Sequence, residues 1–129
     1  MRVYNKWHSI IKKELKKMNL THPQFVVLAS LAYLSQDSNE VTQVMISKLS
    51  GIDVMTVSQI LGLLEKHDFV KRKEHSRDTR AKAVILNKKG EEILQKAVPL
   101  VEQIDEIFFE KLNTDEGQFK HFLVRLNEE

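Results

Sequence analysis

The sequence has 129 residues, a length that suits a single domain or one compact lobe with a helical arm. Hydrophobic residues make up 42% and charged residues 29%, which excludes a disordered or collagen-like chain, and only 4 Gly and 2 Pro favour long helices. Although the net charge is only +2, positive charge is concentrated in a basic block at residues 66–90. The absence of cysteine excludes disulfides, thiolate nucleophiles and cysteine-ligated zinc.

The N-terminal segment predicts an amphipathic helix that ends near Asn19. Apolar residues recur along it at the spacing of one helix face, and lysines occupy the opposite face. Thr21 then opens a capping box with Gln24, and Pro23 suits the first helical turn because its missing N–H needs no partner there. The helix that follows is apolar nearly all round, so we expect it to be buried.

Two short helices are predicted after a polar loop. Thr42 can cap the first of them, in which Ile46 and Leu49 should face inward. Gly51 supplies the left-handed residue that ends this helix, and Asp53 caps the next one after a very short turn. Two short helices joined by a Gly-containing turn indicate a helix-turn-helix unit.

The second of these helices, residues 53–66, divides into an apolar face around Val57 and a polar outer face. Such a helix can enter a DNA major groove. There Gln59 can make a bidentate contact with adenine, Ser58 can reach a phosphate or base edge, and Met55 can meet a thymine methyl group. The alternative is an ordinary amphipathic surface helix, which the preceding capped helix and the following basic block make the weaker interpretation.

The hydrophobic period changes after this helix. Residues 69–74 and 81–87 are short runs on either side of a polar loop, which predicts a two-stranded hairpin. Asn87 should cap a long helix, and its helical spacing continues through Pro99, so we expect a bend there rather than a stop. Thr114 should cap a final helix.

Other functional classes lack support in the sequence. No glycine-rich phosphate loop, HExxH motif or nucleophilic cysteine is present, so we expect no enzyme. The adjacent Glu91 and Glu92 fall in the first turn of a helix, where the helix dipole favours acidic residues without any catalytic role. The five histidines lack the spacing of metal ligands, so we expect neither a metal nor a cofactor. The charged N-terminal segment is not a secretory signal, and the apolar run at residues 25–34 is shorter than the roughly 20 residues that span a bilayer. We therefore expect a cytoplasmic protein.

Three stretches of the chain resemble the multiple-antibiotic-resistance regulator (MarR) family of winged helix-turn-helix proteins. They are residues 20–34, 41–70 and 76–93. The most specific part is Asp78-Thr79-Arg80 followed by AVILNKKG, which is similar to the family's wing and the start of its long dimerisation helix. The resemblance implies a mostly α fold with a small β-hairpin wing. It assigns residues 21–90 to a DNA-binding lobe, and 1–20 and 91–129 to dimerisation helices, within one domain of residues 1–129.

The resemblance also implies roles for individual residues. Arg80 would enter the minor groove, Asp78 would orient it, and the helix at 53–66 would enter the major groove. The predicted DNA-contacting residues are Thr42, Met55, Thr56, Ser58, Gln59, Arg77, Arg80 and Lys82. The predicted dimerisation residues are Val3, Trp7, Ile104, Phe108, Leu112, Phe119, Phe122 and Leu126.

The implied partners are a second copy of the chain, a pseudo-palindromic double-stranded operator and a small-molecule effector, which in this family often binds between the dimer arm and the DNA lobe. The family's thiol-based sensing is excluded because the chain has no cysteine.

A second function stays open, because a fold does not fix what it binds: a winged-helix module for protein or RNA contact without operator-specific DNA binding. RNA-binding surfaces usually expose aromatic side chains on which bases stack. Here the aromatic residues fall in apolar stripes and are predicted to be core, namely Trp7, Phe25, Phe69, Phe108, Phe119 and Phe122. This pattern favours duplex DNA, and with it a sequence-specific transcriptional regulator.

Overall fold

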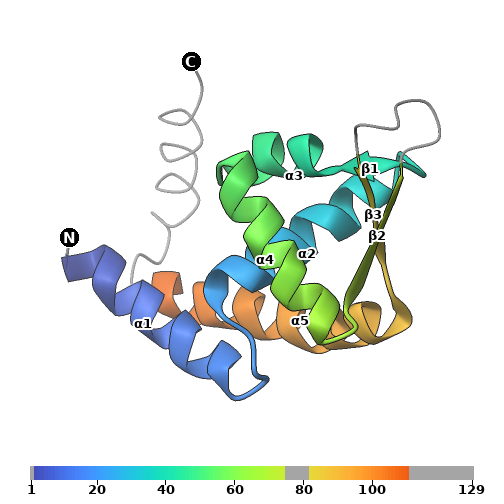
Figure 1. The fold of residues 1–129 in the computed structure, drawn as a ribbon. Coiled ribbons are helices and arrows are strands. Elements are labelled where there is room, and N and C mark those ends of the chain that lie inside the picture. The colour runs from blue at the N-terminus through green and yellow to red at the C-terminus, as the bar shows by residue number, and fades with distance from the viewer. Residues whose placement is uncertain (1, 75–81, 111–129) are drawn as a thin grey trace.

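The computed structural model describes residues 2–74 and 82–110. These residues form five helices and three short strands (Figure 1). The elements are α1 (Arg2–Lys16), α2 (His22–Ser35), β1 (Val41–Thr42), α3 (Gln43–Ser50), α4 (Val54–Lys66), β2 (Val70–Glu74), β3 (Lys82–Leu86) and α5 (Lys88–Phe109). The mostly helical fold with a small antiparallel sheet confirms the predicted fold class.

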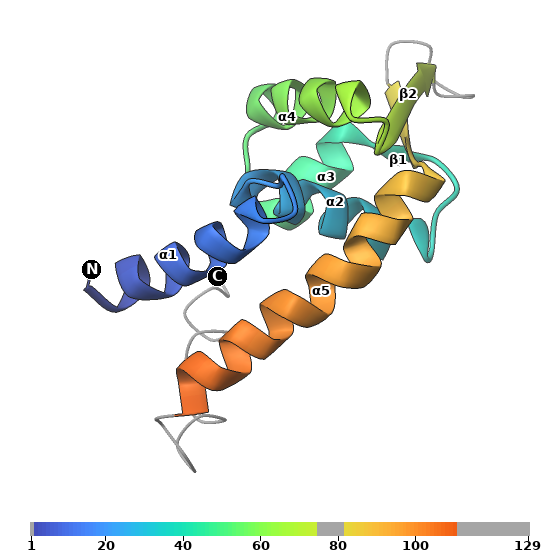
Figure 2. The ribbon, with the colours of Figure 1, turned by 90° about the horizontal axis from the view of Figure 1, so that it is seen from below.

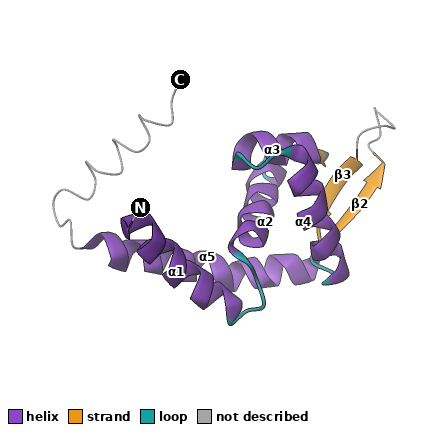
Figure 3. Ribbon diagram, turned by 60° about the vertical axis from the view of Figure 1, so that its left-hand side comes forward, coloured by secondary structure: helices purple, strands orange, loops and turns teal. Residues whose placement is uncertain are grey.

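The elements divide into a lobe, made of α2, α3, α4 and the sheet, and an arm, made of α1 and α5. The long helix α5 packs against both α1 in the arm and α2 in the lobe (Figure 2). It therefore joins the two parts. The β2–β3 hairpin and α1 lie at opposite ends of the molecule (Figure 3). α5 continues through Pro99, as its helical spacing predicted, and the helix predicted from Thr114 lies outside the described residues.

The core lies where the lobe helices meet the arm. The helix α2 supplies buried residues on several sides, which confirms its predicted burial. Fully buried side chains come from α1, α2, α3 and α4, and the largest are Ile11, Leu15, Leu28, Leu31, Ile46, Leu61 and Leu64. The expectation that Leu49 faces inward is wrong, because 47% of this residue is exposed. The inward stripe of α3 runs through Gln43, Ile46 and Ser50, and Leu49 lies to one side of it.

The helices of the lobe begin with the side-chain caps that the sequence predicts. In the capping box of α2, the Gln24 amide donates to the Thr21 hydroxyl at 3.2 Å, and the Gln24 side chain accepts from the Thr21 amide at 3.1 Å. Thr42 caps α3 through a similar capping box with Met45, and the Asp53 side chain caps α4 by accepting from the Thr56 amide. Gly51, with φ of 78°, ends α3 in the left-handed conformation.

Asn87 precedes α5, but the prediction that its side chain caps this helix is wrong. Its Nδ2 donates instead to the carbonyl oxygen of Asp68 at 3.3 Å and to the Asp68 carboxylate at 3.2 Å. Asp68 has a φ of 61°, a left-handed conformation that turns the chain between α4 and β2. The Asn87 amide also donates to the Phe69 carbonyl at 2.9 Å. The start of α5 is therefore fixed to the turn that follows α4.

The sheet has the order β1-β3-β2 with antiparallel neighbours. The predicted hairpin is confirmed, and its strands pair from Val70 opposite Leu86 to Glu74 opposite Lys82. The third strand, β1, was not predicted because two residues cannot show an alternating pattern; Val41 pairs with Val84. The connecting loop, with Arg77, Asp78 and Arg80, lies outside the described residues.

Candidate nucleic-acid interface

The helices α3 and α4 form the predicted helix-turn-helix. Their axes meet at 111°, within the range of about 90–120° for this motif. The Ser47 hydroxyl donates to the Ile52 carbonyl at 2.6 Å and closes the turn between them. No single helix in the described part of the chain is long and apolar enough to cross a membrane, and α3 and α4 meet those criteria only as this bent pair.

The helix α4 presents two different faces. Val57 and Leu61 are fully buried, which fixes the inner face in the core. On the outer face, Met55 is 72% exposed and Gln59 is also exposed, as the helical spacing predicted. A helix that is anchored on one side and exposes Met55 and Gln59 on the other meets the geometric requirement for entering a major groove.

Three predicted contact residues also make bonds inside the protein. The Thr42 hydroxyl accepts from an amide of α3 at 3.2 Å, and the Ser58 hydroxyl accepts from Arg72 at 3.1 Å. The Thr56 hydroxyl donates to Asp53 at 2.6 Å and its amide donates at 3.1 Å. These two bonds hold the pKa of the Asp53 carboxylate below its ordinary value of 3.8.

Arg72 is the residue of this region that sequence analysis missed. It lies on β2, yet its guanidinium donates to Glu65 on α4 at 2.8 Å and to Gln43 on α3 at 3.0 Å. The signal was present in strand alternation: Val70 is buried, and residues two apart on a strand share a face, so Arg72 points inward.

The outward positions of β2 carry positive charge beside α4. Lys71 and Lys73 alternate with Arg72 and are exposed, as is Lys66 at the end of α4. Lys82, a predicted contact residue, lies in β3 opposite Glu74. The described part of the basic block therefore exposes Lys66 at the end of α4, and Lys71 and Lys73 on the face of β2 opposite to Arg72, where they can meet phosphates.

A cavity of about 430 Å³ lies where α1 approaches the start of α2. Two lysines, Lys12 and Lys16, and two histidines, His8 and His22, line it beside apolar residues. The rings of His8 and His22 lie 5.2 Å apart between centroids. Burial, and to a lesser degree the neighbouring His8, lower the pKa of His22, while Asp105 opposes this shift. Because the lowered pKa favours the neutral form of His22, the lysines Lys12 and Lys16 supply the positive charge of this cavity.

Residues 16–104 match the family model of the ArnR1-like winged-helix domain. The HTH-type transcriptional regulator YdcH of Bacillus subtilis (strain 168) is 36% identical over 103 residues, which cover 80% of this chain and 70% of that protein. Both similarities span the helix-turn-helix, the sheet and most of α5.

Two solved structures share the fold. One is a mutant MarR from E. coli complexed with operator DNA, with a TM-score of 0.85 and 22% identity over 99% of this chain and 89% of that one. The other is BpsR of Bordetella bronchiseptica, whose DNA binding is regulated by 6-hydroxynicotinic acid, with a TM-score of 0.83 and 28% identity over 96% and 86%. The chain belongs to the MarR family of winged-helix transcriptional regulators. Its relatives are regulators rather than enzymes.

The predicted dimerisation residues of this MarR-family chain occupy different environments. Val3 on α1 is 63% exposed, whereas Ile104 on α5 is buried within the chain. The Trp7 indole donates to Asp105 at 2.7 Å and so joins α1 to α5. Phe108 is partly buried. Leu112, Phe119, Phe122 and Leu126 lie outside the described residues.

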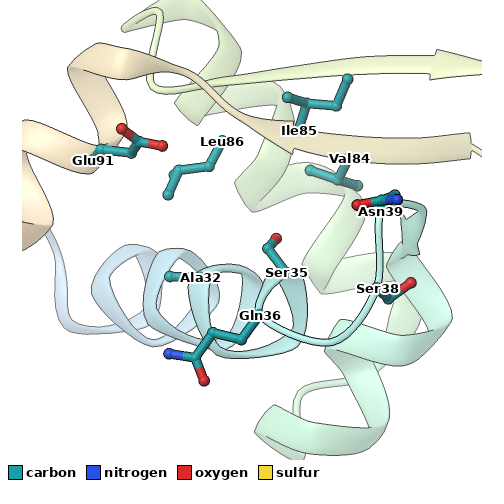
Figure 4. Close-up of a pocket in the computed structure, with 9 residues that line it drawn as sticks. All are labelled: Ala32, Ser35, Gln36, Ser38, Asn39, Val84, Ile85, Leu86 and Glu91. Carbon is teal, nitrogen blue, oxygen red and sulfur yellow. The ribbon is translucent and has the colours of Figure 1, made fainter.

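The MarR-family lobe also carries a shallow groove of about 420 Å³ between α2, β3 and the start of α5 (Figure 4). Ser35 and Leu86 point into it, whereas Gln36 turns away. Of its described lining residues, Glu91 alone is charged. This groove is therefore less suited to an anion than the cationic cavity beside α1.

Proposed function

We propose that this MarR-family chain is a cytoplasmic, sequence-specific regulator that binds double-stranded DNA as a homodimer and responds to a small-molecule effector. The observation that carries the proposal is the geometry of α4. Its inner face is fixed by fully buried residues, its outer face presents Met55 and Gln59, and it follows α3 at 111°. Exposed lysines on β2 supply positive charge beside it.

In this proposal the contacts divide into base reading and phosphate binding. Gln59 and Met55 read base edges in the major groove, with Ser58 and Thr56 at the margin of the same helix. Thr42, at the start of α3, and Lys82, at the start of β3, contact the DNA backbone in this proposal. Arg77 and Arg80 extend the contact through the wing, and Asp78 orients Arg80.

The homodimer is supported by apolar side chains that the described residues leave exposed on the arm. Val3 is 63% exposed on α1 and Ile107 is 59% exposed on α5. Each arm helix thus exposes an apolar side chain that a partner packed along the arm would cover. Two-fold pairing through the arm places two recognition helices about 34 Å apart, one turn of DNA, and so selects a pseudo-palindrome.

The effector site we propose is the cationic cavity beside α1. Lys12 and Lys16 can pair with a carboxylate, and the DNA binding of the relative BpsR is regulated by 6-hydroxynicotinic acid. The cavity lies between the arm and the lobe, so a bound acid can change their relative position. Addition of 6-hydroxynicotinic acid or benzoate should weaken DNA binding, while neutral benzamide should have no effect.

The proposal is tested by selecting duplexes from a randomised library with the wild-type protein and measuring their binding over a range of salt. We expect enrichment of a pseudo-palindrome, a linear loss of affinity with salt on a log-log plot, and a dimer by sedimentation. Gln59→Ala should change the preferred base at one half-site position, at about 1–3 kcal/mol. The control is Gln103→Ala, an exposed glutamine on the arm. Failure to enrich any duplex, or tighter binding to single-stranded RNA, would contradict DNA regulation.

A further inference from the structure

Arg72 makes a set of hydrogen bonds that connects three elements of the interface. From β2, its Nε donates to Glu65 Oε1 at 2.8 Å, and its Nη2 lies 2.6 Å from the same oxygen. Its Nη1 donates to Gln43 Oε1 at 3.0 Å, to the Ser58 hydroxyl at 3.1 Å and to the Ser58 carbonyl at 3.3 Å. One side chain thus joins the wing strand to both helices of the helix-turn-helix.

The environment of Arg72 separates it from the lysines around it. Its side chain is only 18% exposed, and its charge is balanced by Glu65. Lys71 and Lys73, on either side along β2, are exposed. Because residues alternate along a strand, the lysines face outward while Arg72 faces the helices. Arg72 therefore offers little charge to phosphates, although it lies in the middle of the basic strand.

The bonds from Arg72 to Ser58 hold the part of α4 that carries the proposed base-reading residue. Ser58 immediately precedes Gln59, the exposed residue that we propose reads a base. Gly62 follows one turn later, and a Cβ built there would lie 3.6 Å from Nη2, so the guanidinium rests close to this side of α4. The planar guanidinium can satisfy three partners in fixed directions, which a lysine ammonium on a flexible stem cannot.

We propose that Arg72 is a positioning residue for DNA recognition: it holds α4 in one orientation relative to α3 and β2 without touching DNA itself. This inference rests on the proposed function. Sequence-specific contacts need correct placement of α4, whereas non-specific binding depends on phosphate charge. Loss of Arg72 should therefore reduce discrimination between duplexes and leave the salt dependence unchanged.

The main test compares Arg72→Met with Lys73→Met, which removes the same charge from the same strand. Binding is measured to the duplex that the wild type enriches and to a scrambled duplex of equal composition, over a range of salt and well below the melting temperature. We expect Arg72→Met to lose about tenfold affinity for the enriched duplex only, which corresponds to about 1.4 kcal/mol. Lys73→Met should weaken both duplexes and reduce the salt slope by about one. Equal weakening by Arg72→Met with a reduced slope, or no change, would overturn the proposal.

Two further variants guard against a simple loss of folding. Arg72→Lys keeps the charge but cannot bridge the three partners, so we expect it to lose discrimination while retaining the wild-type salt slope. Glu65→Gln should act through the same contact, so combining it with Arg72→Met should do little more than Arg72→Met alone. Full additivity, or wild-type discrimination by Arg72→Lys, would count against the positioning role.

A measurement without DNA separates this inference from the proposed function. Amide hydrogen exchange along residues 58–62 should be faster in Arg72→Met than in Lys73→Met, because only the first variant releases α4. If the wild type enriches no duplex, the proposed function fails, and hydrogen exchange still decides whether Arg72 holds α4. Equal exchange in the two variants would remove the positioning role.

Discussion

The lobe and the arm bury their apolar residues in different ways. In the lobe, Leu61 and Leu64 of α4 are fully buried by neighbouring elements of the same chain. In the arm, Ile11 and Leu15 of α1 are also fully buried, but Val3 and Ile107 are more than half exposed. Burial within one chain stabilises that chain alone, whereas exposed apolar surface gains stability only from another surface. Both regions expose some apolar residues. Those of the lobe include Met55, on the face of α4 that we propose reads DNA, whereas we propose that those of the arm meet a second copy of the chain.

Helix capping shows the same division. The lobe helices α2, α3 and α4 begin with side-chain caps from Thr21, Thr42 and Asp53. The arm helix α5 begins without one, because Asn87 bonds to Asp68 in the turn after α4. Caps satisfy amides locally, whereas the Asn87 bonds connect distant segments. The lobe helices are thus defined by their own sequence, and α5 is fixed by its attachment to the lobe.

The largest effect expected from this contrast is the truncation of a core leucine. Leu61→Ala should lower the free energy of unfolding by about 2–5 kcal/mol, since it leaves a cavity among buried residues. Ile107→Ala, on the exposed side of α5, should change it by less than about 0.5 kcal/mol in dilute protein. Urea unfolding at low protein concentration measures both values.

The same pair of variants also tests the interaction surface. For a dimer joined through the arm, the wild-type melting temperature rises with protein concentration, and Ile107→Ala should weaken this dependence. Leu61→Ala should lower the melting temperature while keeping the dependence. Equal loss of unfolding free energy in the two variants would show that Ile107 is packed within its own chain as Leu61 is, and it would contradict an interaction surface on the arm.

A smaller effect is expected at the joint between lobe and arm. A Cβ at position 90 would clash with the Phe69 carbonyl oxygen and would lie 2.8 Å from a Leu86 methyl carbon. Gly90→Ala should therefore destabilise the protein by about 1–3 kcal/mol through overpacking. Gly62→Ala is the matched control, because its new Cβ meets only Arg72 Nη2 at 3.6 Å. Removing a glycine from the middle of a helix should stabilise by about 0.5–1 kcal/mol. Thermal melts of both variants decide, and a stabilising Gly90→Ala would show that the joint can open at little cost.

How far the sequence predicts the structure depends on the range of the interaction. The capping box of Thr21 and Gln24 and the two faces of α4 follow from residues three or four positions apart, and both were predicted. Asn87 was misassigned because its partner, Asp68, lies 19 residues away and is presented by a left-handed turn. Strand alternation indicates that Arg72 points inward, but it does not identify partners such as Gln43, which lies 29 residues away.

The candidate site is predictable to the same degree. The exposure of Met55 and Gln59 follows from helical spacing and is confirmed. The roles of Arg80 and Asp78 come from a resemblance to a family rather than from spacing. Both residues lie outside the described part of the chain, so their roles stay predictions.

The smallest effect we expect concerns the cap of α4 and its dependence on pH. The Thr56 hydroxyl and amide hold the pKa of Asp53 below its ordinary value of 3.8, so the folded state favours the charged carboxylate. A lowered pKa contributes stability that is fully present above the unfolded value and is lost as the pH falls through the folded value. Asp53→Ser and Asp53→Asn keep a neutral cap that cannot titrate in this range. The wild type should therefore be more stable than either variant at about pH 7, and this advantage should shrink below about pH 4. Urea midpoints of the three proteins along the acid range measure it, since the remaining carboxylates are common to all three. An advantage that grows on acidification would mean that Asp53 is not held in its charged form by Thr56.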